Sequence, residues 1–232
     1  MKGFSTLFLL TLLSTVAIGQ SGPPPLCKPC LFYGGDLDGG ANEAMFWNEN
    51  TLNDANTQTF GEITVPKGHA VLVEGILFQA LFQSEFRLDP KVVPWQIRSG
   101  NIFADGGNLV ASGSSGVLMQ PTGRQVDGAV EYTVVAKVDP PLELNGGAPR
   151  GTEYWFNLMP QCTNSRDQVC HNIIYYVSNT TYETNSVRGA AQKGGLAVIN
   201  SPLRGYQWET LCEIEFRGCD WLSFGLIGTA LY

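Results

Sequence analysis

Two aspartates, Asp36 and Asp38, stand in a glycine-rich segment at residues 34–40, with an asparagine and a glutamate just beyond it. Hard oxygen ligands on a flexible loop suit Ca²⁺, which takes about six to eight of them. The spacing does not complete an EF-hand, because Trp47 occupies the place of the closing glutamate. The pattern predicts a structural calcium site at Asp36 and Asp38, with an ordinary Asx turn as the alternative.

Aromatic residues are the second group that could bind a ligand. Tryptophans in strands mostly pack in a core. The segment at residues 204–208 is the least strand-like of those that carry a tryptophan. We therefore predict that Trp208 and Tyr206 are exposed ligand-binding residues that stack on the sugar rings of an extracellular glycan or matrix.

Carboxylate pairs could hydrolyse glycosidic bonds without a histidine. Glu213 and Glu215 share one face if their segment is extended. Histidine-based hydrolysis is disfavoured, because only His69 and His171 occur and no Gly-x-Ser-x-Gly motif is present. A glycan hydrolase or lyase using paired carboxylates therefore stays open as an alternative. Its candidate carboxylates are Glu62, Glu74, Glu131, Glu153, Glu209, Glu213 and Glu215.

Six cysteines fall into three close pairs: Cys27 and Cys30, Cys162 and Cys170, Cys212 and Cys219. The last two pairs bracket short polar segments, which makes local 162–170 and 212–219 bridges the simplest arrangement. The Cys-x-x-Cys pair follows a proline run and precedes a strand, whereas a thioredoxin-type motif opens a helix. A zinc site would need two more ligands at a compatible spacing. We therefore predict structural disulfides.

The first nineteen residues predict the compartment. A basic start, a short apolar run and small residues at 17–19 are typical of a secretory signal peptide rather than a membrane span. The chain carries 14 basic and 21 acidic residues, which argues against binding nucleic acid or an anionic membrane. We expect a secreted, extracellular protein with no membrane span, a Pro-rich segment at 20–30 and one domain at 31–232.

Strand signals dominate the rest of the chain. Short apolar or alternating segments end at glycine or proline, and no convincing amphipathic helix exceeds two turns. This predicts an all-β, antiparallel β-sandwich, jelly-roll-like and disulfide-stabilised. We expect a strand near 131–138 that stops at Pro140-Pro141, and a flexible loop at Ser112–Gly116. The other expected strands are 59–65, 70–82, 92–98, 109–113, 153–160, 173–178 and 221–228.

Several sequence segments form one pattern. They include Phe32-Tyr33-Gly34-Gly35-Asp36-Leu37-Asp38, Trp95-Gln96-Ile97-Arg98-Ser99-Gly100 and Phe224-Gly225-Leu226-Ile227-Gly228. Through these, residues 31–228 resemble a group of uncharacterised secreted β-sandwich proteins, chiefly bacterial, which often end in a surface-sorting tail. The resemblance implies an exported jelly-roll-like module and carries no activity. This chain differs from the group in its six cysteines and in lacking the sorting tail, so we expect a released protein.

Together these features predict a secreted, non-catalytic β-sandwich module that binds glycan or matrix through loops and an exposed aromatic. A structural or adhesive extracellular protein is a further alternative, and it predicts an exposed apolar patch or edge strand.

Overall fold

The computed structural model describes residues 26–36, 46–49, 58–83, 86–88, 93–126, 129–147, 149–159, 162–164, 174–177, 179–180, 187–188, 192–201, 205–210 and 221–231. The predicted signal peptide and most of the Pro-rich segment lie outside these residues. Among the described residues, no helix is long and apolar enough to cross a bilayer.

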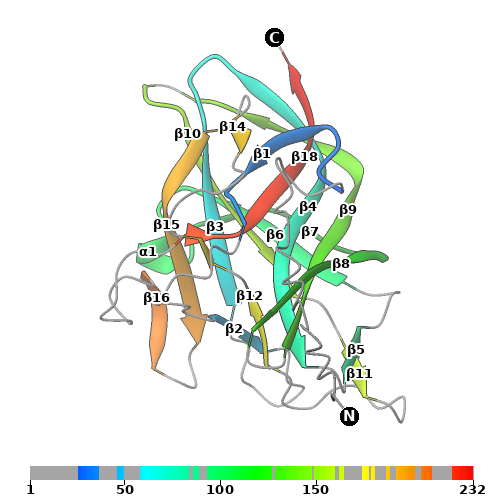
Figure 1. Cartoon of the computed structure of the whole chain (residues 1–232). Coiled ribbons are helices and arrows are strands. Elements are labelled where there is room, and N and C mark those ends of the chain that lie inside the picture. Colours follow the sequence, from blue (N-terminus) through cyan, green and yellow to red (C-terminus); the bar gives the residue numbers. More distant parts are fainter. Residues whose placement is uncertain are drawn as a thin grey trace, which may run out of the picture.

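The described strands form two antiparallel sheets, which confirms the predicted β-sandwich (Figure 1). The larger sheet runs β8-β9-β4-β18-β1-β14, and β12 and β2 continue it beyond the end of β18. Its strands are β1 (Cys30–Tyr33), β2 (Phe46–Glu49), β4 (Ala70–Gln83), β8 (Val117–Val126), β9 (Ala129–Asn145), β12 (Ile174–Val177), β14 (Val187–Arg188) and β18 (Phe224–Leu231).

The second sheet has six strands in the order β16-β15-β3-β10-β6-β7. These are β3 (Gln58–Val65), β6 (Val93–Ser99), β7 (Asn108–Ser115), β10 (Thr152–Leu158), β15 (Gln192–Ser201) and β16 (Tyr206–Thr210). Two small ladders join β5 (Phe86–Leu88) to β11 (Cys162–Asn164), and β13 (Asn179–Thr180) to β17 (Trp221–Leu222). The one helix described is the short α1 (Ile102–Asp105).

Aromatic side chains fill the space between the sheets. Phe224 of β18 lies 5.1 Å from Phe32, 5.7 Å from Phe78 and 6.5 Å from Phe156 between ring centroids. On the facing strand β3, a Cβ at Gly61 would come within 2.6 Å of the Phe224 ring. Glycine at this position therefore allows the two sheets to approach closely around one aromatic cluster.

Part of the larger sheet, including the centre of β4, is also buried on its other face. Along β4, Ile76 and Phe78 point into the main core, whereas Leu77 packs with Cys27 and Tyr33 in a second cluster. Successive strand residues point to opposite faces, so a strand buried on both faces reads as a continuous apolar run. This explains why residues 70–82 show so little alternation.

Two local expectations are wrong. β9 does not stop at Pro140-Pro141 but continues to Asn145, because the prolines lie where the register with β4 shifts between Val73 and Gly75. Proline lacks an N–H, so it is tolerated where no ladder hydrogen bond is required. Residues 112–115 are not a flexible loop, because the strand expected at 109–113 extends to Ser115 as β7 and pairs with β6.

Candidate functional site

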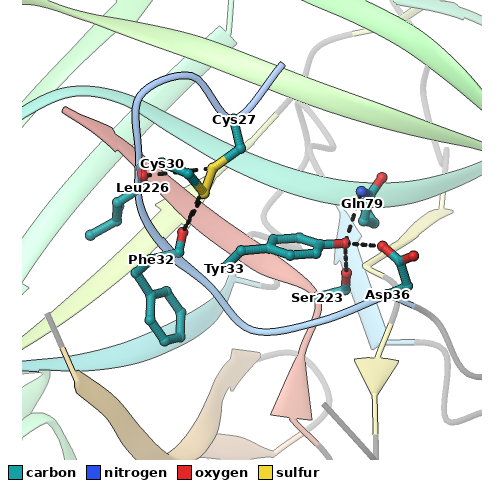
Figure 2. Close-up of a disulfide and its surroundings, with 8 residues drawn as sticks. All are labelled: Cys27, Cys30, Phe32, Tyr33, Asp36, Gln79, Ser223 and Leu226. Carbon is teal, nitrogen blue, oxygen red and sulfur yellow. Dashed lines mark hydrogen bonds between the residues drawn. A yellow bond between two sulfur atoms is a disulfide. The ribbon is translucent and has the colours of Figure 1, made fainter. Parts of the chain in front are cut away.

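Asp36 lies three residues after the end of β1, in a group of hydrogen-bonded side chains. The Tyr33 hydroxyl donates to Asp36 Oδ1 at 2.5 Å, and Gln79 Nε2 donates to the Tyr33 oxygen at 3.1 Å. Ser223 Oγ lies 3.2 Å from the same phenol oxygen, and Thr133 Oγ1 donates to Gln79 Oε1. Figure 2 shows the Tyr33 ring pointing from β1 toward these polar groups.

Arg124 of β8 joins this group to a second buried carboxylate. Its Nη1 lies 3.1 Å from Asp36 Oδ2, and its Nε lies 2.5 Å from Glu131 Oε2. Thr122 Oγ1 donates to the same Glu131 oxygen at 2.6 Å. Glu131 is fully buried and Asp36 nearly so. One guanidinium therefore bridges two buried carboxylates, one from β9 and one from the segment that follows β1.

The electrostatics agree with this geometry. Burial acts to lower the pKa of Arg124, but the nearby Glu131 and Asp36 carboxylates outweigh it and raise that pKa. Burial, reinforced by the Asp36 charge, raises the pKa of Tyr33 well above its ordinary value. Arg124 therefore stays charged and Tyr33 stays a neutral hydrogen-bond donor, which are the states that this group requires.

The predicted calcium site falls only partly within the described residues. Asp36 directs one carboxylate oxygen to Tyr33 and the other to Arg124. Asp38 lies outside the described residues, so calcium binding by the pair stays a prediction. Among the described residues, no group of three or more His, Cys, Asp or Glu side chains could hold a metal ion.

The structure also places Trp208, the predicted ligand-binding residue. Its ring centroid lies 5.5 Å from that of Phe60, and the Arg98 guanidinium carbon lies 5.1 Å from the centroid of the Trp208 ring. Trp208 has a φ of +56°, the one positive φ among the described residues other than glycine. The side chain is half-buried, so it is neither in the core nor fully exposed.

The C-terminal end of helix α1 packs against the Trp208 ring. Asn101 Oδ1 accepts from the Phe103 N–H at the start of the helix, and Gly106 ends it in the left-handed region at φ +85°. A Cβ on Gly106 would lie 2.3 Å from the Trp208 ring. Ring and helix end are therefore in direct contact, and glycine is required there on both conformational and steric grounds.

Arg98 ties these parts together. Its Nη1 donates to the Gly106 carbonyl at 2.7 Å, and its Nε donates to Gln96 Oε1 at 2.9 Å. Partial burial lowers the pKa of Arg98, and the charge of Asp105 opposes this. Phe103, which is 40% exposed, packs edge-on against Trp155 at 5.8 Å, and Trp155 belongs to the buried cluster that Trp208 also contacts. We call Phe103, Trp208, Arg98 and Asp105 the aromatic platform.

The other predicted aromatic residues fall in different places. Trp95 and Trp155 are buried, as expected of strand tryptophans, and the Trp155 indole donates to the Gly100 carbonyl. The backbone of Tyr206 begins β16 opposite Ser201. The side chains of Tyr206, Trp47 and Trp221 lie outside the described residues. An exposed row of aromatics is therefore not among the described features.

The candidate carboxylates for glycan hydrolysis are dispersed. Glu131 is committed to Arg124, whereas Glu62 is buried and Glu153 exposed. Glu62 pairs with Trp155 across β3 and β10, which makes it a diagonal neighbour of Glu153 on one face of the six-stranded sheet. Glu74 and Glu209 are half-buried, and Glu213, Glu215 and His171 lie outside the described residues. His69 is exposed in a turn.

One of the three predicted cysteine pairs is described. Cys27 and Cys30 form a disulfide with Cα atoms 4.7 Å apart, at the start of β1 (Figure 2). Cys27 is buried in the second cluster with Leu77 and Val135. The Cys162 backbone pairs with Leu88, and Cys170, Cys212 and Cys219 lie outside the described residues. The 162–170 and 212–219 bridges therefore stay predictions.

Comparison with known proteins found no matching family model, no similar curated protein and no similar solved structure. The resemblance to secreted bacterial sandwich proteins therefore stays a prediction.

Sequence reasoning missed two partners in these groups. Arg124 follows a proline and a glycine in a segment where no strand was predicted, so nothing local indicated that it would meet Asp36. Arg98 belongs to an expected strand and to the Trp95–Gly100 segment of the resemblance, and neither indicates a contact with Trp208. Strand pairing places both residues. β8 lies beside β9, which carries Glu131, and β6 lies beside β10, where Arg98 is opposite Trp155.

Proposed function

We propose that this protein is a secreted, non-catalytic β-sandwich module that binds an extracellular glycan at the aromatic platform. Ligand sites combine aromatic surface with a few fixed polar groups. The platform has both, because Trp208 and Phe103 supply ring surface and Arg98 and Asp105 supply a donor and an acceptor.

The observation that carries the proposal is the left-handed backbone of Trp208. An L residue in that region costs about 1–2 kcal/mol, so surrounding contacts must hold it there. Phe60, Gly106 and Arg98 make those contacts. Strained residues of this kind concentrate at binding sites, and a ring that is already immobilised loses little entropy when a sugar stacks on it.

A glycan array probed with the mature chain, residues 20–232, tests the proposal. We expect specific binding that Trp208→Gly weakens about tenfold or more, equivalent to about 1.4 kcal/mol. Glycine accepts the positive φ, so this variant removes the ring without adding backbone strain. Leu118→Ala, at an exposed position on β8, is the matched control and should bind as the wild type does.

Parallel arrays with EDTA address the predicted calcium site. Binding lost in EDTA would point to Asp36 and Asp38, whereas binding unchanged by EDTA would place recognition on the platform alone. If the wild type binds no glycan in either condition, or if folded Trp208→Gly binds as tightly as wild type, the proposal is wrong.

A glycan hydrolase is the second candidate, and the diagonal Glu62–Glu153 pair favours it. Diagonal neighbours on a sheet have Cβ atoms within about 7–8 Å, near the spacing of the two carboxyl groups in inverting glycosidases. Turnover of polysaccharides, abolished by Glu62→Gln or Glu153→Gln, would support this candidate over a purely binding role.

A further inference from the structure

Strand β7 ends the six-stranded sheet. β6 pairs with one of its edges, and no described strand pairs with the other. An unpaired edge presents backbone N–H and C=O groups to a further strand. Ser112 and Ser114 are exposed along β7, and Leu109 and Val110 are 56% and 39% exposed. β7 is thus an accessible edge with apolar side chains at one end.

Sheet edges are normally blunted by charge, proline, bulges or short length. The other terminal strands show these devices: β14 has two residues and contains Arg188, and β2 has four and contains Glu49. β16 carries Glu209 and the left-handed Trp208. β8 carries Pro121 and Arg124, and its register shifts between them.

β7 lacks most of this protection. It has eight residues, and every residue from Gly106 to Gly123 is uncharged. Its register shifts once, at Val110, which leaves the run from Ala111 to Ser115 in regular pairing with β6. The regular half of β7 therefore has neither a charge, a proline nor a bulge to prevent another strand from pairing with it.

We propose that β7 is a self-association edge, at which a second copy of this chain pairs its own β7 in antiparallel orientation. The charge pattern permits this partner. The chain has a formal net charge of −7, so two copies repel over most of their surfaces. β7 is a place where they meet without bringing like charges together.

Two-fold symmetry fits the sequence of the strand. Identical antiparallel strands make a closed, self-complementary contact rather than an open fibre. An axis at Gly113 sets Ser112 of each copy opposite Ser114 of the other, where hydroxyl groups can hydrogen-bond across the strands. The pairing extends each six-stranded sheet into one continuous sheet through the dimer. The N-terminal end of β7 adjoins the aromatic platform, because Leu109 lies opposite Arg98, whereas Gly113 at the proposed axis lies opposite Trp95, outside the platform. Self-association at this edge supports the structural or adhesive alternative.

Sedimentation velocity over a series of concentrations of residues 20–232 tests the proposal. We expect a reversible dimer for the wild type and a monomer at every concentration for Ser112→Lys/Ser114→Lys. The lysines reduce the net negative charge, so overall repulsion between copies falls. Dissociation would therefore report local repulsion between the two β7 strands.

Two further samples separate the β7 edge from other causes. Gln120→Lys/Gln125→Lys places the same added charge at exposed positions of β8 and should dimerise like the wild type. Ser112→Glu/Ser114→Glu should be monomeric alone. Mixed with the lysine variant it should form a one-to-one dimer, because Lys and Glu then face each other across the axis. Circular dichroism confirms that each variant is folded.

A wild type that stays monomeric at the highest concentration would overturn the proposal. So would a lysine variant on β7 that dimerises normally, a β8 variant that dissociates equally, or a mixture of folded lysine and glutamate variants that stays monomeric.

Discussion

Arg124 supplies the positive charge that compensates two buried carboxylates. It pairs with Glu131, which is fully buried, and with Asp36, whose other oxygen accepts from Tyr33. Burying a carboxylate is costly unless an opposite charge and hydrogen bonds compensate it. The arrangement provides both, and it connects the chain after β1 to the outer strand β8. We interpret it as a brace that holds the N-terminal segment against the larger sheet.

Arg124→Met should therefore destabilise the protein strongly. Removing one partner of a fully buried ion pair leaves uncompensated charge and costs about 3–5 kcal/mol. Because the Arg124 side chain is 34% exposed, we expect a loss at or below the lower end of that range. Lys137→Met is the matched control, because the Lys137–Asp139 pair has a similar distance of 2.8 Å but both side chains are largely exposed. That change should cost less than about 1 kcal/mol. Urea denaturation measures both values, and equal losses would contradict the brace.

At the scale of elements, a four-residue helix sets the position of a half-buried tryptophan. α1 is too short to be stable alone, so its caps and its packing must define it. Ile102 anchors it in a cluster with Phe60 and Trp155, and Gly106 ends it against the Trp208 ring. The helix and β16 therefore support each other, and the aromatic platform exists only when both are in place.

Comparison of two glycines tests this dependence. Gly106 and Gly123 have nearly equal φ values of +85° and +86°, but nothing lies within 4 Å of a Cβ added at Gly123. Gly123→Ala should cost about 1–2 kcal/mol for the left-handed backbone alone.

Gly106→Ala should cost a further ~1–3 kcal/mol, because its methyl group overlaps the Trp208 ring. It should also change the near-UV circular dichroism and weaken glycan binding, whereas Gly123→Ala should do neither. Equal stability losses and equal spectra would show that Trp208 does not rest on Gly106.

For the whole molecule, the main architectural fact is that the centre of the larger sheet is buried on both faces. One face packs on the six-stranded sheet through the Phe224 cluster, and the other holds Cys27, Tyr33 and Leu77. The second face combines an apolar cluster with a polar group of side chains. The stability of the whole fold is therefore linked to the protonation of a side chain in that group.

Tyr33 makes this linkage measurable at alkaline pH. Its pKa in the folded protein is raised, chiefly by burial, so the folded state retains a proton that the unfolded state releases above about pH 10. The stability contribution is fully present below that pH and is lost as pH rises above it. One such group lowers the free energy of unfolding by about 1.4 kcal/mol per pH unit.

Urea denaturation of the wild type and Tyr33→Phe on either side of about pH 10 checks the sign and size of this effect. The variant should be less stable at neutral pH, because Asp36 and Gln79 lose a partner. Its stability should then fall less steeply with rising pH. Identical slopes for the two proteins would contradict a raised pKa for Tyr33.

Much of the fold follows from local sequence. Apolar runs between glycines and prolines predicted β3, β4, β6, β10 and β12 close to their observed bounds. Turn residues and alternation act over a few positions, so they can be read without the rest of the chain. The predictions of strand ends that were wrong depended on contacts with strands distant in the sequence. β9 continues past Pro140-Pro141 because a register shift accommodates the prolines, and the strand expected at 109–113 continues through Ser115 because β6 pairs with it.

The chain by itself determined an all-β sandwich, a close cysteine pair at its start and the types of side chain available for binding. The tertiary structure decided which of these side chains meet. Asp36 finds Arg124 and Glu131, Trp208 adopts a left-handed backbone over Gly106, and β7 keeps one open edge. The physical reason is the same in each case: these contacts join strands that are distant in sequence, so only strand order and register determine them.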